Sequence, residues 1–325
     1  MRKRLEEFGV RIGRFERGKK NLITDVPGVL VGNYTLVSDE EGIIRTGITA
    51  VLPHPGNLYE DRVFAGLFVM NGYGKSCGLV QIEELGLLES PILVTSTFNV
   101  GRVWDGLLEY VLERNPGARS VNPVVLECND SRVSESERRP LGRNEVFKSL
   151  EVASESFELG NVGAGTGMVT FGYKGGLGSS SRTVGGYTVG ALVVSNFGRE
   201  EDLGGSIIVI IATNAPLVPN QLRRLSRRGA VGIHRAGGRV THSSGDIVLS
   251  FSTAFKVPRK GRISLEYIPD DDPIFQDLLD AAVDSTEEAI YDALLCAEDM
   301  PGRDSKVWKA VDPEVILRKL SGGLI

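Results

Sequence analysis

The sequence contains little histidine or cysteine, and this scarcity excludes several kinds of catalytic and structural site. Only three residues of each type occur among 325. The cysteines are widely spaced, odd in number and form no Cys-x-x-Cys pair, so we expect neither a disulfide framework nor a zinc site. The histidines, His54, His234 and His242, are too few for most histidine-based metal sites and offer few partners for a Ser-His-Asp triad.

Excess positive charge and long apolar runs are also missing. The net charge is −5, from 37 Lys and Arg against 42 Asp and Glu, whereas binding to nucleic acid or anionic membranes favours a basic surface. No apolar run is long enough to span a membrane. The basic start at 1–4 is not followed by the apolar segment of a signal peptide. We therefore expect a cytoplasmic protein that binds neither nucleic acid nor membranes.

Glycine is abundant, with 40 residues, and short apolar runs alternate with turn signals. This pattern predicts many strands and a few long helices, which together favour a layered α+β or α/β domain spanning 1–325. The segment 130–143 is charged and predicts a surface loop. The glycine-rich stretches 160–167 and 175–178 predict tight turns or backbone held close to a substrate. The predicted strands are 29–32, 48–52, 63–69, 92–95, 124–127, 188–195, 206–213 and 246–253, and the predicted helices are 106–114, 144–157, 219–228 and 273–300.

The most informative stretch is Gly204-Gly205-Ser206, which leads directly into the β-branched run 207–213. The run predicts a buried strand with the serine at its start. Gly-Ser before a strand is most often only a turn. It is also the arrangement that a self-cleaving chain requires, because glycine leaves its carbonyl open to attack and tolerates strained backbone. Cleavage between Gly205 and Ser206 gives Ser206 a free α-amine, and therefore a nucleophile and a base on one residue.

A second serine motif, Gly-Lys-Ser-Cys-Gly at 74–78, matches the G-x-S-x-G pattern of α/β-hydrolases. It follows a predicted strand, but the later histidines lie in no obvious catalytic loop, so this interpretation is not favoured. A phosphate-binding loop is excluded because Val69 stands where its first glycine belongs. A dinucleotide fingerprint is excluded because Met168 stands where its third glycine belongs.

Four polar residues near strand ends are further candidates. Asn196 ends a predicted strand, so its amide is either a turn residue or a donor to an oxyanion. Ser244 and Asp246 precede another strand, where they form a hydrogen-bonded turn or else relay a proton and hold an α-amine. Glu127 ends a buried strand, so its carboxylate requires a partner or a perturbed pKa. That partner is a substrate ammonium or a Lys or Arg of the protein.

Six segments carry a resemblance to a known family. They are Asn-Leu-Ile-Thr-Asp-Val-Pro-Gly-Val at 21–29, Arg-Thr-Gly-Ile-Thr at 45–49, Gly-Leu-Leu-Glu-Ser-Pro-Ile at 86–92, Gly-Asn-Val-Gly-Ala-Gly-Thr-Gly-Met at 160–168, Ser-Ile-Ile-Val with Ala-Thr-Asn-Ala-Pro-Leu at 206–217, and Ser-Gly-Asp-Ile at 244–247. Together they resemble the L-aminopeptidase D-Ala-esterase/amidase (DmpA) family, peptidase family S58, which includes the β-peptidyl aminopeptidases. The resemblance extends from about residue 20 to about residue 300.

The resemblance implies a four-layer αββα sandwich similar to, but connected differently from, N-terminal nucleophile hydrolases and shared with ornithine acetyltransferases. It implies self-cleavage into an α chain, 1–205, and a β chain, 206–325. The implied activity is the release of N-terminal residues from short peptides, amides or esters with a free N-terminus, through an acyl-enzyme and without a metal or cofactor. The implied assembly is a homo-oligomer, often a tetramer of αβ units.

The resemblance also implies roles for individual residues. Ser206 matches the nucleophile, and Asn196 matches the amide of the oxyanion hole. Ser244 and Asp246 match a serine and a carboxylate beside the nucleophile, although relatives often have glutamate at the second position. Glu127 matches the residue that binds the free amine of the substrate.

At one position the sequence departs from a relative. Asn129 stands where at least one relative has a tyrosine that contributes to the oxyanion hole, and its shorter side chain puts that role in doubt. Two other functions remain open. One is an ornithine-acetyltransferase-like acyl transferase, although that nucleophile is typically a threonine after alanine. The other is a non-catalytic homologue that is never cleaved.

Overall fold

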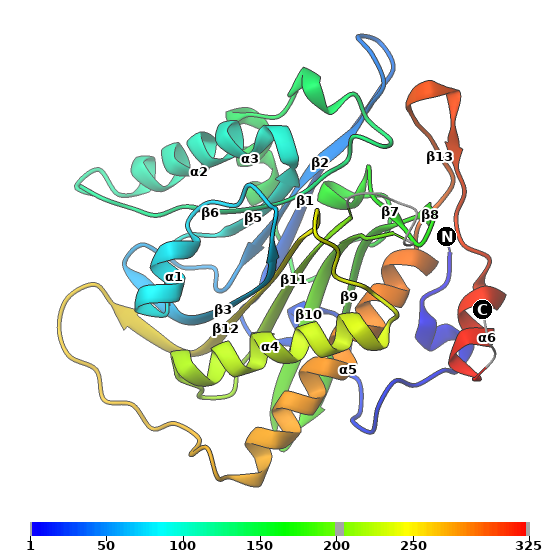
Figure 1. The fold of residues 1–325 in the computed structure, drawn as a ribbon. Helices are drawn as coiled ribbons and strands as arrows, with labels where there is room; N and C mark the ends of the chain where they lie inside the picture. The colour runs from blue at the N-terminus through cyan, green and yellow to red at the C-terminus, as the bar shows by residue number, and fades with distance from the viewer. Residues whose placement is uncertain (1, 199–204, 323–325) are drawn as a thin grey trace.

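Two β-sheets face each other in a computed structural model that describes residues 2–198 and 205–322 (Figure 1). The small sheet has the strand order β1-β2-β5-β6, and the large sheet has the order β4-β3-β12-β11-β10-β9. Neighbouring strands are antiparallel except for β5 with β6 and β11 with β12, which are parallel. Helices α2 and α3 lie on the outer side of the small sheet, and α4 and α5 lie on the outer side of the large sheet.

The strands and helices have the following bounds. The small sheet contains β1 (Leu30–Ser38), β2 (Ile44–Leu52), β5 (Ile92–Ser96) and β6 (Val124–Cys128). The large sheet contains β3 (Asp61–Gly72), β4 (Leu87–Leu88), β9 (Gly176–Val184), β10 (Tyr187–Asn196), β11 (Ser206–Thr213) and β12 (Gly245–Pro258). The helices are α1 (Leu79–Leu85), α2 (Val100–Arg114), α3 (Arg143–Glu151), α4 (Pro219–Arg235), α5 (Pro273–Leu295) and α6 (Pro313–Leu320). Two short hairpins pair β7 (Val169–Thr170) with β8 (Tyr173–Lys174) and β13 (Met300–Pro301) with β14 (Val307–Trp308).

Three apolar cores fill the spaces between the four layers, and the alternation within each strand explains them. In β11, Ile208 and Ile210 pack in the core between the two sheets. Val209 and Ile211 of the same strand pack against α4 and α5 on the other face. A third core joins the small sheet to α2 and α3. The strand β11 is apolar from Ile207 to Ala212 because both of its faces are buried. The expected αββα sandwich is thus confirmed.

Two predicted segments differ from the structure. The helix predicted at 144–157 ends at Glu151, because Ser154 leaves it to form two main-chain hydrogen bonds with Val31 of β1. The segment 130–143 is not a simple surface loop. Asp130 and Val133 are fully buried there, and Val133 packs with Val169, Met300 and Trp308.

The long helix and the glycine-rich stretches also depart from their predicted patterns. From 281 to 295, α5 is buried on every side, whereas the sequence predicts one apolar stripe. The strand β9 was not predicted, because its glycines and serines have low strand propensity. Gly178 is required there since an added Cβ would lie 1.9 Å from the carbonyl oxygen of Ala289 in α5. Gly163 likewise permits close packing against β1 and β2 rather than contact with a cavity.

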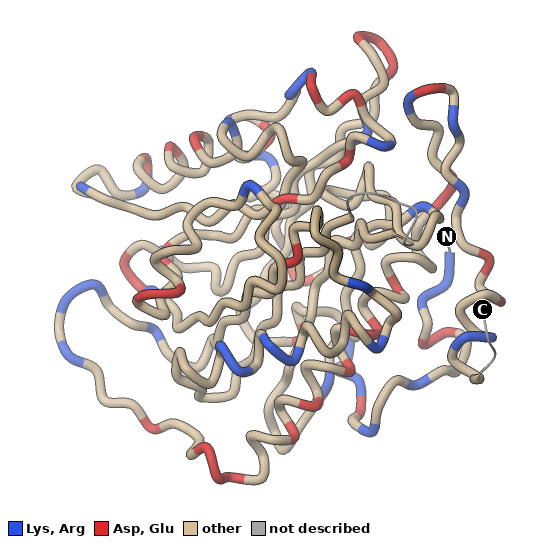
Figure 2. Tube along the Cα trace, in the orientation of Figure 1, with Lys and Arg blue, Asp and Glu red and all other residues tan. Residues whose placement is uncertain are grey.

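Charged residues of both signs are interspersed along the described trace (Figure 2). The arginines of α4 are exposed or half-buried, as predicted, and several pair with acidic neighbours, such as Arg224 with Asp270 at 3.1 Å. Among the described helices, none is long and apolar enough to cross a membrane.

Candidate active site

Ser206 is the first residue of β11. On one side of it β10 ends, and on the other side β12 begins. Ser206 lies opposite Asn196, the last residue of β10, and beside Gly245, the first residue of β12. The Gly245 N–H donates to Ser206 Oγ at 3.2 Å. Ser206 is 7% exposed. A hydroxyl with little exposure at the open end of a buried strand is placed to react with a molecule that enters from that end.

Gly205 is held in a space that only glycine fits. An added Cβ would lie 2.5 Å from the Cα atom of Phe197 and 2.9 Å from the carbonyl oxygen of Asn196. Real Cβ atoms do not approach other atoms so closely, so any larger residue must displace the end of β10. The peptide bond before Ser206 is therefore packed tightly against the residues that follow β10.

Ser244 and Asp246 lie together at the start of β12: Ser244 directly precedes the strand, and Asp246 is its second residue. Ser244 Oγ donates to an Asp246 carboxylate oxygen, and it also contacts the Thr241 carbonyl at 2.8 Å. Burial raises the pKa of Asp246 to about 6, against lowering contributions from the Ser244 hydroxyl and the Ile207 N–H. Ile207 directly follows Ser206 in the chain, so the Asp246 carboxylate is held at the residue next to Ser206.

The Asn196 side chain is fixed at both ends. Its oxygen accepts the Val169 N–H at 2.9 Å, and its nitrogen donates to the Asn129 carbonyl at 2.7 Å. An amide nitrogen carries two hydrogens, so one remains for another acceptor. The Asn129 side-chain oxygen accepts the Ser131 N–H at 2.9 Å. The amide nitrogen of Asn129 therefore faces away from the Ser131 N–H.

Glu127, at the end of β6, is 2% exposed and only half satisfied. Its Oε1 accepts the Lys75 N–H at 3.1 Å, and the Lys75 ammonium is 4.0 Å from the same oxygen. Its Oε2 is buried and has no hydrogen-bond partner among the described residues. Burial raises the pKa of Glu127, and the Lys75 charge, the Lys75 N–H and the nearby Thr97 hydroxyl lower it only in part. A buried carboxylate oxygen without a partner is a binding position for a cation or a donor.

One cavity of about 460 Å³ joins these groups, and it opens between the ends of the two sheets. Gly205, Ser206, Glu127 and Asn129 line it, so four of the seven predicted site residues share one cavity. The other three do not line the cavity but lie next to residues at its wall: Asn196 is beside Ser206, and Ser244 and Asp246 flank Gly245. The residues that complete the lining are Tyr73, Lys75, Ser131, Arg132 and Ser243.

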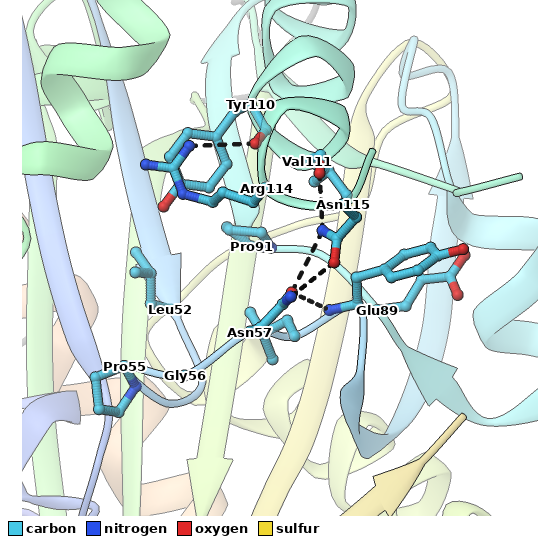
Figure 3. A pocket seen from close by; sticks show the side chains of 12 residues that line it. Leu52, Pro55, Gly56, Asn57, Glu89, Pro91, Tyr110, Val111, Arg114 and Asn115 are labelled. Atoms are coloured by element: carbon cyan, nitrogen blue, oxygen red, sulfur yellow. Dashed lines mark hydrogen bonds between the residues drawn. The ribbon is translucent and has the colours of Figure 1, made fainter. Parts of the chain in front are cut away.

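A second pocket, of about 370 Å³, lies at the opposite end of the small sheet and lacks this chemistry (Figure 3). Asn57 and Asn115 point toward each other there and form a hydrogen bond of 2.7 Å. The Glu89 carboxylate is occupied by Asn122 and Arg259. Because its polar groups satisfy one another, this pocket offers no unpartnered buried group of the kind found at Glu127.

The G-x-S-x-G segment at 74–78 has the strand–turn–helix context of its motif but not the chemistry. It follows β3 and precedes α1, yet the Ser76 hydroxyl is buried without a hydrogen-bond partner in the described structure. His242 contacts the ring of Tyr73 instead. The segment serves the cavity differently, because Lys75 holds Glu127. The sequence does not predict the contact of Lys75 with Glu127, and it gives no signal for Tyr73 or Arg132, which only the folded chain brings to the cavity.

No group of three or more His, Cys, Asp or Glu side chains in 2–198 and 205–322 is arranged to hold a metal ion.

Comparisons with known proteins agree with this arrangement. A model of peptidase family S58 matches residues 21–308. The β-peptidyl aminopeptidase BapA of Sphingosinicella xenopeptidilytica is 34% identical, and the alignment covers 89% of this chain and 84% of BapA. The crystal structure of the PH0078 protein from Pyrococcus horikoshii OT3 is 45% identical with a TM-score of 0.93, covering 98% of this chain and 99% of that one.

A third relative bears on the fold. The L-aminopeptidase D-Ala-esterase/amidase from Ochrobactrum anthropi is 32% identical with a TM-score of 0.89, and the match covers 99% of both chains. Its structure is described as a prototype for the serine aminopeptidases and as a new variant among the Ntn hydrolase fold. The two sheets and their outer helices are therefore a variant of that fold here too.

Proposed function

This chain belongs to peptidase family S58, and from that premise we propose that its active residue is Ser206, acting from a new N-terminus. The family and the fold make the protein an N-terminal-nucleophile hydrolase of peptide bonds, of the aminopeptidase type. The observation that carries the proposal is the single cavity lined by both Ser206 and the half-satisfied Glu127.

Maturation is the first step of the proposal. Ser206 Oγ attacks the Gly205 carbonyl carbon, the C–N bond to Ser206 breaks, and an ester joins Gly205 to Ser206 Oγ. Water then hydrolyses the ester, leaving a carboxylate on Gly205 and an α-amine on Ser206. The products are the α chain 1–205 and the β chain 206–325. The tight packing of Gly205 supports this step because it holds the carbonyl in one place.

Catalysis then uses the new α-amine as the base. An α-amine has an unperturbed pKa of about 7.7–8.0, so part of it is free base near neutral pH. It takes the proton of Ser206 Oγ as the oxygen attacks the substrate carbonyl, and it returns that proton to the departing amine. Water hydrolyses the acyl-enzyme. Asp246 holds the α-ammonium, and Ser244 orients the Asp246 carboxylate.

The oxyanion and the substrate amine each have a proposed partner. The second hydrogen of the Asn196 amide donates to the oxyanion, a contact worth about 10²–10³ in rate for one donor. Asn129 is the second proposed donor. The Oε2 oxygen of Glu127 binds the substrate ammonium, which requires a free N-terminus and makes the enzyme an exopeptidase. A blocked N-terminus is rejected because the buried carboxylate then stays unpaired.

The substrates we propose are short peptides, amides and esters with a free amine, including those of β-amino acids. The support is the β-peptidyl aminopeptidase among the relatives and the small size of the cavity. We also propose a homo-oligomer, a tetramer of αβ units, which sedimentation velocity tests. A cytoplasmic location is proposed, with support from the free thiols of all three cysteines.

Two alternatives remain weaker. The comparisons favour a hydrolase over an acyl transferase, since the relative BapA is a β-peptidyl aminopeptidase. Against a non-catalytic homologue, the cavity of Glu127 also contains the Ser206 hydroxyl at the start of β11. The direct test is hydrolysis of alanyl and β-alanyl p-nitroanilides and of their N-acetyl forms. We expect release from the free amines only, and none by Ser206→Ala. Equal release from the acetylated forms contradicts the role of Glu127.

A further inference from the structure

Lys75 lines the Ser206 cavity, and the chemistry just described gives its side chain no direct role. Its main chain is rigidly held, because its N–H donates to Glu127 Oε1 at 3.1 Å. On one side of it, Cys77 forms two main-chain hydrogen bonds with Val125 of β6. On the other side, the Tyr73 N–H donates to the Ser244 carbonyl at 3.2 Å. The segment 73–77 therefore bridges the two sheets at the edge of the cavity.

The side chain of Lys75 is half exposed and points along this edge. Its ammonium lies 4.0 Å from Glu127 Oε1 and 5.4 Å from the centre of the Tyr73 ring. Neither contact is a full hydrogen bond, so the donors of this ammonium are available to a ligand in the cavity. The neighbouring carboxylate is the one that we assign to the substrate amine.

The charges around Glu127 change when a substrate binds. Without substrate, the Lys75 ammonium lies 4.0 Å from this carboxylate, and its charge lowers the pKa of Glu127. A substrate ammonium on Oε2 neutralises the charge of Glu127. The Lys75 ammonium then has no anion to balance it, and it lies at the end of the cavity that holds the N-terminal residue of the substrate. A carboxylate on that residue, attached to the carbon that bears the amine or to the next one, falls between the two ammonium groups.

We propose that Lys75 selects substrates whose N-terminal residue carries a carboxylate next to its amine, namely aspartyl and β-aspartyl (isoaspartyl) peptides. The inference rests on the proposed function, since it takes Glu127 as the ammonium site and Ser206 as the nucleophile. A charge-assisted hydrogen bond in a partly desolvated cavity is worth about tenfold or more in kcat/KM. Neutral residues of the same shape lack this contact.

The test compares p-nitroanilides of aspartic acid, linked through either carboxyl group, with those of asparagine and isoasparagine. This leaving group carries no carboxylate, so only the acyl residue differs. We expect the acidic form to exceed its amide in kcat/KM by about tenfold. Lys75→Met keeps the length of the side chain and leaves the main-chain N–H to Glu127 in place. In this variant we expect the ratio to fall to about one or below.

Lys148→Met is the matched control. Lys148 also has its ammonium over a tyrosine ring, at 5.5 Å from Tyr34, but it lies on α3 away from the cavity. We expect the acid-to-amide ratio to be unchanged in this variant. A wild-type ratio near one, or a ratio that survives Lys75→Met, overturns the proposal.

Two further outcomes are separated by the same set of substrates. Suppose that alanyl-glycine and its amide differ in kcat/KM, that Lys75→Met removes this difference, and that the anilides show none. Lys75 then binds the carboxylate of the leaving residue, and the proposal is wrong. If no free-amine substrate is hydrolysed at all, the proposed function itself fails. Hydrolysis of neutral anilides without an acidic preference refutes only the role of Lys75.

Discussion

Individual residues of the site are chemically unequal, and their surroundings explain the difference. Glu127 and Asp246 are both buried carboxylates with a raised pKa, but Asp246 is met by a hydroxyl and an N–H, whereas one oxygen of Glu127 is left without a partner. The first arrangement fixes a carboxylate in place. The second leaves room for a ligand. These two environments support the proposed roles, Asp246 as the group that holds the α-ammonium and Glu127 as the group that binds the substrate amine.

Glu127→Gln separates binding from folding. The amide keeps the shape of the side chain and removes a buried charge, so we expect the free energy of unfolding at pH 7 to be unchanged or higher. Loss of the charge paired with the substrate ammonium costs about 2–5 kcal/mol, so kcat/KM for free-amine substrates should fall by about 10²-fold or more. Urea denaturation and steady-state kinetics measure the two effects. Unchanged kinetics would remove Glu127 from the site.

The pH dependence of kcat reports on Asp246. Burial raises its pKa to about 6, so it takes up a proton at a pH where an ordinary aspartate is still ionised. The α-amine base is protonated below about 7.7–8.0, so kcat falls first as the pH drops through that range. Since the ionised form of Asp246 is the one that holds the α-ammonium, we expect a second limb, with a steeper fall in kcat, as the pH drops through about 6. Glu127 contributes little to kcat because the bound ammonium keeps it ionised. Asp246→Asn should lower kcat and abolish the fall of kcat near pH 6. If the fall near pH 6 persists in the variant, another group is responsible for it.

At the scale of elements, strands with strong apolar patterns were predictable and glycine-rich ones were not. The sequence predicts β11 because its β-branched run is continuous, and it predicts the αββα layers only through the family resemblance. The sequence cannot predict β9, because its glycines and serines have low strand propensity. Small residues occur there because α5 packs too closely for larger side chains. The site residues Ser206, Glu127 and Asn196 lie at strand ends and could be named. Lys75 could not, because its contact with Glu127 depends on a chain segment that crosses between sheets.

A substitution in β9 and a control substitution in α2 test this account. We expect them to change the free energy of unfolding in opposite directions. Gly178→Ala places a Cβ about 1.9 Å from the Ala289 carbonyl oxygen, so we expect a loss of about 2–3 kcal/mol in the free energy of unfolding. Gly101→Ala lies in α2 with open space around the added Cβ, and we expect a gain of about 0.5–1 kcal/mol. Denaturant unfolding measures both. A tolerated Gly178→Ala means that β9 and α5 are not so closely packed.

For the whole molecule, the proposed cut falls in the middle of the large sheet. The strands β11 and β12 belong to the segment 206–325, and they lie between β10 and β3 of the segment 1–205. Each boundary is a full strand pairing, and the cores on both faces of the sheet contain residues of both segments. We expect the two chains to remain one folded unit after cleavage and to separate only in denaturant. Separation on gel filtration without denaturant would contradict this interlocked arrangement.

The central claim is that Ser206 becomes a chain terminus before it can act. Mass spectrometry in denaturant, with N-terminal sequencing of the same sample, tests it on active wild-type protein and on Ser206→Ala. The account predicts two wild-type chains, one beginning Ser-Ile-Ile-Val, and a single inactive chain of 35.1 kDa for the variant. Fully active wild-type protein that consists of only the 35.1 kDa chain, or a variant that is still cut at this bond, would contradict it.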